Sequence, residues 1–104
     1  MTPPRPWIVW ITSAVPAYPS GALYYPETHG YGFGEVTLNE AREKGAHVAA
    51  RFAERTGAPQ KVSIRRYCDV CGATGRVKGN HKCKACGTNG STPVETAIYK
   101  RLNP

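Results

Sequence analysis

The sequence has no long hydrophobic run. Its main apolar segment, Trp7 to Ile11, is five residues long, whereas a membrane-spanning helix needs roughly 18 or more apolar residues. A secretory leader is not expected either, because no small-residue cleavage site follows this segment cleanly. We therefore expect no membrane span, and we expect the protein to be cytoplasmic, in an intracellular and reducing environment.

Recognisable catalytic arrangements are also missing from the sequence. There is no Ser/His/Asp order, no phosphate-binding loop, and no Glu or His beside a cysteine pair in the manner of the zinc-dependent deaminases. The sequence therefore predicts a protein that is not an enzyme, and it identifies no small-molecule substrate. A small enzyme that uses the tyrosine-rich segment 16–34 as a lid is the remaining alternative.

Acidic residues are scarce in the second part of the chain. Residues 1–60 hold five Lys or Arg and five Asp or Glu, whereas residues 61–104 hold nine and two. The whole formal net charge of +7 therefore lies in residues 61–104. An excess of positive charge in one region is typical of surfaces that attract phosphate groups or acidic proteins.

A length of 104 residues fits one domain. With 11 Gly and 9 Pro, much of the chain is irregular. Disulfides or a metal site are therefore expected to stabilise the fold in addition to the hydrophobic core. We predict a single domain over residues 1–104, with a neutral β-β-α half (1–60) and a basic zinc-hairpin half (61–104).

Hydrophobic periodicity in the first half predicts two strands and a helix. Alternation from Trp7 to Thr12 indicates a strand covered on both faces, and residues 32–38 indicate a second strand that leads directly into the helix. Thr37 and Glu40 match a capping box, so Thr37 is the expected N-cap. The helix is expected to end near Gly57.

The second half predicts two more strands, at 61–67 and 94–102. The positions expected to face inward are Val62, Ile64, Val94, Thr96 and Ile98. The predicted fold class is α+β: a small antiparallel sheet with one helix packed on it, in the order β-β-α-β-β, and a zinc loop at the tip of the last hairpin. The tyrosines of 16–34 either pack on this sheet or form a stacking surface.

The four cysteines form an internal repeat. Cys68-Asp-Val-Cys71-Gly-Ala-Thr-Gly75 recurs fifteen positions later as Cys83-Lys-Ala-Cys86-Gly-Thr-Asn-Gly90. Two such pairs supply the four thiolates of a tetrahedral site, so we predict one structural Zn²⁺ per chain. Iron at the same site, disulfides and thiol redox chemistry are the alternatives. His81 is expected at the surface or behind the ligands.

The two repeats resemble the cysteine-rich zinc units of DnaJ-type co-chaperones and the knuckles of zinc ribbons, over residues 68–90 only. Each unit places its first glycine, Gly72 or Gly87, one position earlier than the co-chaperone pattern does. Two repeats are present instead of four, and the His-Pro-Asp triplet of a J domain is absent. The resemblance implies a zinc module and does not imply a chaperone role.

Two binding functions are consistent with these features. The first is contact with DNA or RNA through the basic zinc-hairpin half. The second is a zinc-dependent interaction or regulatory module that docks on a larger protein. The candidate contact residues are Arg65, Arg66, Tyr67, Arg76, Lys78, Lys82, Lys84, Tyr99, Lys100 and Arg101.

Overall fold

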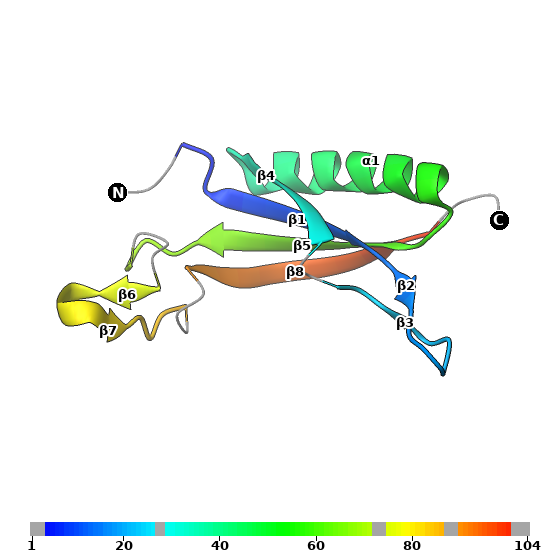
Figure 1. The fold of residues 1–104 in the computed structure, drawn as a ribbon. Coiled ribbons are helices and arrows are strands. Elements are labelled where there is room, and N and C mark those ends of the chain that lie inside the picture. Colours follow the sequence, from blue (N-terminus) through cyan, green and yellow to red (C-terminus); the bar gives the residue numbers. More distant parts are fainter. Residues whose placement is uncertain (1–3, 27–28, 72–74, 87–89, 101–104) are drawn as a thin grey trace.

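The protein has an α+β fold with one helix on one face of an antiparallel sheet (Figure 1). The computed structural model describes residues 4–26, 29–71, 75–86 and 90–100. The main sheet has the strand order β4-β1-β5-β8, and its strands are β1 (Trp7–Ser13), β4 (Gly30–Glu35), β5 (Gln60–Tyr67) and β8 (Ser91–Tyr99). The predicted fold class is confirmed.

The helix α1 (Leu38–Thr56) has the predicted caps at both ends. The Thr37 hydroxyl accepts a hydrogen bond from the Glu40 amide at 3.1 Å, which satisfies one of the free donors of the first turn. Gly57 follows the helix with a φ of 72°, and its N–H donates to the carbonyl of Ala53. Glycine adopts the left-handed backbone conformation at little energetic cost, so the helix ends at this position.

Small residues on α1 bring the helix close to the sheet. Ala41, Gly45, Ala49 and Ala53 are its buried positions. They pack on β1 and β5, the two central strands, and the core consists of Val9, Ile11, Ala41, Ala49, Val62 and Ile64. The prediction that Val62 and Ile64 face inward is confirmed. No helix of the described residues has the length and apolar character needed to cross a membrane.

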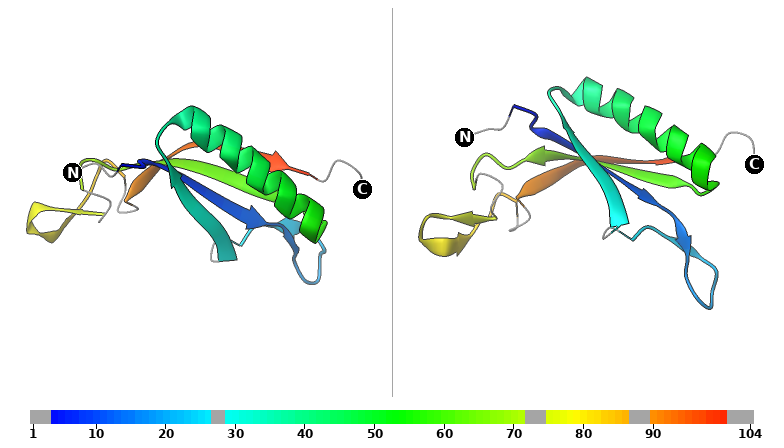
Figure 2. Two further views of the ribbon diagram at one scale, coloured as in Figure 1. Left: turned by 90° about the horizontal axis from the view of Figure 1, so that it is seen from above. Right: turned by 45° about the horizontal axis from the view of Figure 1, so that its top comes forward.

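The second face of β1 is covered less than the sequence predicted. Ile8 and Trp10 on that face are half-buried, and none of the described helices or strands stacks over them. The indole of Trp10 lies against β4, because a Cβ added to Gly32 would come within 2.6 Å of it. We call this side, opposite α1, the open face of the sheet (Figure 2).

The inward face of β8 is the opposite of the predicted one. Glu95, Ala97 and Tyr99 lie on the helix side, because they pair in register with Ile64, Val62 and Gln60. A bulge between Ile64 and Arg65 leaves Val94 without a register partner. Val94 and Ile98 are consequently 44% and 46% exposed. β8 is an edge strand with small and polar residues on both faces, so the alternation of apolar and polar residues in its sequence is too weak to show which face lies inward.

The composition of segment 16–34, rich in Pro, Gly and Tyr, indicates a long and partly ordered loop, but the structure contains regular strands there. A two-stranded ribbon forms from β2 (Val15–Pro16), at the start of this segment, and β3 (Leu23–Tyr24), and β4 already begins at Gly30. Tyr18 at the ribbon's turn is 99% exposed, whereas Tyr31 lies edge-on to Phe52, with 5.6 Å between ring centroids. The packing interpretation therefore holds for Tyr31, whereas a stacking role for the exposed Tyr18 stays a prediction.

Candidate metal centre

The cysteines lie on a small hairpin that extends from one end of the main sheet (Figure 1). Between β5 and β8 the chain forms β6 (Arg76–Val77), a 3-10 turn η2 (Lys78–Asn80) and β7 (His81–Lys82). β6 and β7 pair antiparallel. We refer to the described residues between 68 and 90 as the cysteine hairpin. The predicted insertion in the last hairpin is thus a hairpin itself.

The four sulfur atoms form a compact buried cluster. All of them lie within 4.8 Å of one another, and the Sγ distances are 3.8 Å between Cys68 and Cys83 and 3.6 Å between Cys71 and Cys86. A tetrahedron with Zn–S bonds of about 2.3 Å has S···S edges of about 3.8 Å. The cysteines are free thiols, and these distances are far above the roughly 2.05 Å of a disulfide bond.

Backbone hydrogen bonds join the two repeats in a crossed pattern. The amide of Cys68 donates to the carbonyl of Gly90, and the amide of Cys83 donates to the carbonyl of Gly75, each at 2.9 Å. Each half of the repeat therefore holds the first cysteine of the other half. The two hydrogen bonds join equivalent residues of the two sequence repeats, so the repeats are related by an approximate two-fold axis.

The last glycine of each repeat also orients a sulfur atom. The amide of Gly75 donates to Cys71 Sγ at 3.3 Å, and the amide of Gly90 donates to Cys86 Sγ at 3.2 Å. Both glycines have positive φ, 76° and 79°, a conformation that favours glycine. Gly72 and Gly87, the glycines directly after each second cysteine, lie outside the described residues.

The thiols of the cluster differ in acidity. For Cys71, burial acts to raise the pKa, but the Gly75 amide and bonds from the neighbouring cysteines outweigh it, and the pKa falls to about 6. For Cys68, the Cys71 amide acts to lower the pKa, but burial and bonds with neighbouring thiols prevail and raise it to about 11. A metal that binds all four sulfurs as thiolates must therefore displace protons.

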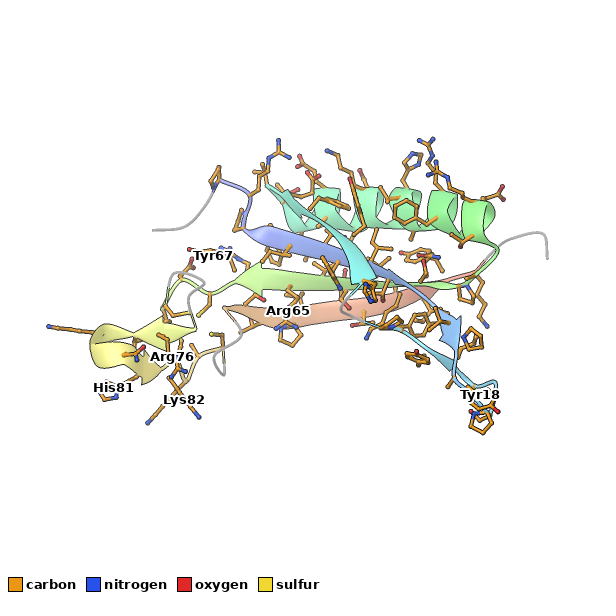
Figure 3. All side chains as sticks on the ribbon, in the orientation of Figure 1. Tyr18, Arg65, Tyr67, Arg76, His81 and Lys82 are labelled. Carbon is orange, nitrogen blue, oxygen red and sulfur yellow. The ribbon has the colours of Figure 1, made fainter. Side chains whose placement is uncertain are left out.

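Four predicted contact residues are exposed on the cysteine hairpin: Arg76, Lys78, Lys82 and Lys84. Arg76 and Lys82 are register partners across β6 and β7, and both lie at the lower side of the hairpin in Figure 3. His81 is also exposed there, and the four-cysteine cluster does not include it. The structure thus brings this part of the predicted surface together.

Arg65 has a role that sequence reasoning missed. Its Nε donates to Ser91 Oγ at 2.7 Å, and its Nη2 donates to the Ser91 carbonyl at 2.8 Å. Ser91 directly follows Gly90, whose carbonyl accepts from Cys68. Arg65 therefore ties the end of the cysteine hairpin to the sheet.

Arg66 and Tyr67 also lie where the hairpin joins the sheet. The guanidinium of Arg66 stacks over Trp7, 5.1 Å from the ring centroid, and lies 4.0 Å from the Asp69 carboxylate. The amide of Tyr67 donates to the Pro6 carbonyl at 2.8 Å. These partners are distant in the chain or depend on side-chain direction, so the sequence offered no signal for them.

The remaining predicted contact residues are not on the hairpin. Tyr99 pairs with Gln60 at the end of the sheet far from the cysteines and packs against the core. Lys100 follows it and is exposed. Arg101 lies outside the described residues. The predicted contact surface is therefore split between two ends of the molecule.

Comparison of the chain with protein-family models, with curated proteins and with solved structures finds no match. Four buried cysteines at these distances form a metal-binding arrangement of zinc-finger-like character.

Proposed function

We propose that the protein is a small zinc-stabilised binding protein that contacts nucleic acid through its cysteine hairpin. The observation that carries this proposal is the exposure of Arg76, Lys78, Lys82 and Lys84 on one protruding hairpin. Asp69 is the only acidic residue of the sequence between Cys68 and Gly90, and it lies beside Arg66 at the base. Phosphate groups are the natural partners of such a surface.

The proposed role of the metal is structural. Four thiolates complete the coordination of zinc, whereas a catalytic zinc keeps one position for water or substrate. In this proposal the metal holds the basic side chains of the hairpin in a fixed arrangement. A reducing compartment keeps such cysteines from forming disulfides, which supports an intracellular location.

The open face of the sheet extends the proposed contact surface. The cysteine hairpin and the ribbon that carries Tyr18 project from opposite ends of the sheet, both on the side away from α1 (Figure 3). Trp10, half-buried, lies on the sheet between them. Aromatic side chains stack with unpaired bases, so the proposal favours a single strand that runs from the hairpin across this face.

Salt dependence of binding tests the proposal. If the four basic residues each neutralise one phosphate, the slope of log affinity against log salt is about −2.8 for a single strand. Affinity should then fall about 50-fold between about 50 and about 200 mM salt. The measurement is fluorescence anisotropy of labelled single-stranded DNA and RNA with the zinc-loaded protein.

A matched pair of variants locates the surface. Lys82→Gln/Lys84→Gln should make the slope less steep by about 1.4 units, because two phosphate contacts are lost. Arg51→Gln/Arg55→Gln removes the same charge from exposed positions of α1 and should leave the slope unchanged. An equal loss in both variants, or binding that does not respond to salt, would reject the proposed contact surface.

A further inference from the structure

The two edges of β1 can be assigned from its hydrogen bonds. The carbonyl of Pro6 accepts from Tyr67, and the amide of Ala14 donates to Pro59, each at 2.8 Å. Backbone groups of successive strand residues alternate in direction. The even-numbered residues of β1 therefore bond to β5, and the odd-numbered residues bond to β4.

This alternation places glycines at the outer edge of β4. The odd-numbered residues of β1 pair with Tyr31, Phe33 and Glu35, so the amides and carbonyls of Gly30, Gly32 and Gly34 point away from the sheet. β4 is the last strand of the sheet on this side. The Gly34 carbonyl accepts from Arg5 at 3.4 Å, and no bond from the outer groups of Gly30 or Gly32 is recorded among the described residues.

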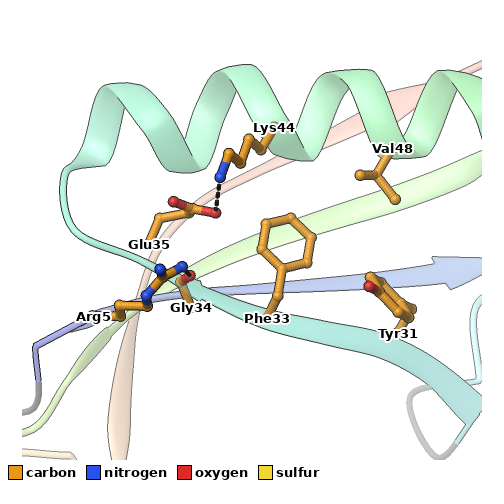
Figure 4. Close-up of a pocket in the computed structure, with 7 residues that line it drawn as sticks. All are labelled: Arg5, Tyr31, Phe33, Gly34, Glu35, Lys44 and Val48. Atoms are coloured by element: carbon orange, nitrogen blue, oxygen red, sulfur yellow. Dashed lines mark hydrogen bonds and ion pairs between the residues drawn. The ribbon is translucent and has the colours of Figure 1, made fainter.

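A groove runs between this edge and α1. β4 leads directly into the helix, and the two then diverge (Figure 2). Two adjoining hollows of about 350 and about 310 Å³ lie between them and share Tyr31 and Val48. Phe33 contributes to the first and Phe52 to the second. The groove is therefore lined with apolar and aromatic side chains (Figure 4).

One flank of the groove is basic. Lys44, His47, Arg51 and Arg55 follow one another along the side of α1 that faces it. The acidic residue of the lining, Glu35, is buried, and its carboxylate lies 3.1 Å from Lys44 Nζ. The charge that the groove presents to a ligand is thus positive, supplied by Arg51 and Arg55 on α1 and by Arg5 at the other end.

We propose that this groove binds an extended acidic segment of a partner protein, which adds to β4 as a further strand. The peptide backbone would pair with the outward groups of Gly30 and Gly32, and every second side chain would enter the groove. Acidic side chains would meet the basic flank of α1. A peptide is favoured over nucleic acid because only a peptide matches the donors and acceptors of a strand edge.

This inference goes beyond the proposed nucleic-acid contact and uses different residues. It is tested with a phage-displayed library of random 12-residue peptides, selected on the immobilised zinc-loaded protein. Enriched clones should be rich in Asp and Glu. Their synthetic peptides should bind Arg51→Gln/Arg55→Gln about tenfold more weakly and Lys82→Gln/Lys84→Gln as tightly as the unchanged protein.

Backbone pairing has its own readout. Amide hydrogen exchange followed by NMR should slow at Gly30 and Gly32 when an enriched peptide binds, and N-methylation of alternate peptide residues should abolish binding. The proposal is overturned if no enriched peptide is sensitive to Arg51→Gln/Arg55→Gln, or if exchange at both glycines is unchanged. Loss of oligonucleotide binding in the same variant would assign the groove to nucleic acid instead.

Discussion

The substitution Gly45→Ala tests how closely α1 lies on the sheet. A Cβ at this position would be 3.1 Å from Val62 Cγ1 and 3.3 Å from Val9 Cγ1, whereas carbon atoms in good contact lie about 3.5–4.0 Å apart. Both valines are buried and β-branched, so they have little freedom to rotate away. The helix would have to move outward by a few tenths of an ångström.

Two opposing effects determine the stability of this variant. Replacing glycine by alanine inside a helix stabilises it by about 1 kcal/mol. Overpacking a close-packed core costs about 1–3 kcal/mol. A cost of about 2 kcal/mol, the middle of that range, is partly offset by the helical gain of about 1 kcal/mol. We therefore expect Gly45→Ala to lower the free energy of unfolding by about 1 kcal/mol and the melting temperature by about 4–8 °C.

Urea denaturation of the unchanged protein, of Gly45→Ala, of Val62→Ala and of the double variant separates the two effects. In a Val62→Ala background, which removes the nearest methyl group, Gly45→Ala should stabilise the protein by about 1 kcal/mol. Ala50→Gly on the exposed side of α1 serves as the control and should cost about 1 kcal/mol. The close approach of helix and sheet would be refuted if Gly45→Ala stabilised the protein equally in both backgrounds.

Three further predictions concern the metal, its anchor and an ion pair. The purified protein should contain one zinc per chain by elemental analysis, and Cys83→Ser should lower that ratio and the zinc affinity, because three thiolates leave the tetrahedron incomplete. Arg65→Met should cost about 1.5–3 kcal/mol in urea denaturation of the zinc-loaded protein, through the loss of its charged hydrogen bonds to Ser91. The hydrogen bond from Arg42 holds the pKa of Glu95 below its ordinary value of 4.5. The unchanged protein should therefore have a larger free energy of unfolding than Glu95→Gln above the ordinary glutamate pKa. This difference should vanish as the pH falls through the lower pKa of the folded state. Titration of both proteins with urea at neutral and acidic pH measures that difference, and an advantage that persists in acid would contradict it.

The elements predicted correctly from the sequence are those with short-range signals. Thr37 and Gly57 mark the ends of α1 through bonds to residues three or four positions away. The cysteine repeat specifies its own geometry through spacing and glycines. Such signals need no knowledge of the rest of the fold.

The errors arose where tertiary context decides the outcome. The orientation of β8 depends on a bulge opposite Ile64 and on the ion pair that draws Glu95 towards α1. The contact role of Arg65 stays a prediction, but its bond to Ser91, 26 positions away, could not be seen in the sequence. The groove beside β4 was missed because its walls come from two elements, although the basic residues along α1 were visible as part of a polar face.

The crossed hydrogen bonds of the cysteine hairpin separate two tasks within it. The bonds between Cys68 and Gly90 and between Cys83 and Gly75 enclose the ligands, whereas β6, η2 and β7 extend beyond them. The residues of the tip can therefore change in identity, and even in number, while the arrangement of the four cysteines stays the same. Substitutions in the tip would therefore alter the chemistry of its surface without disturbing the backbone bonds that hold the four cysteines.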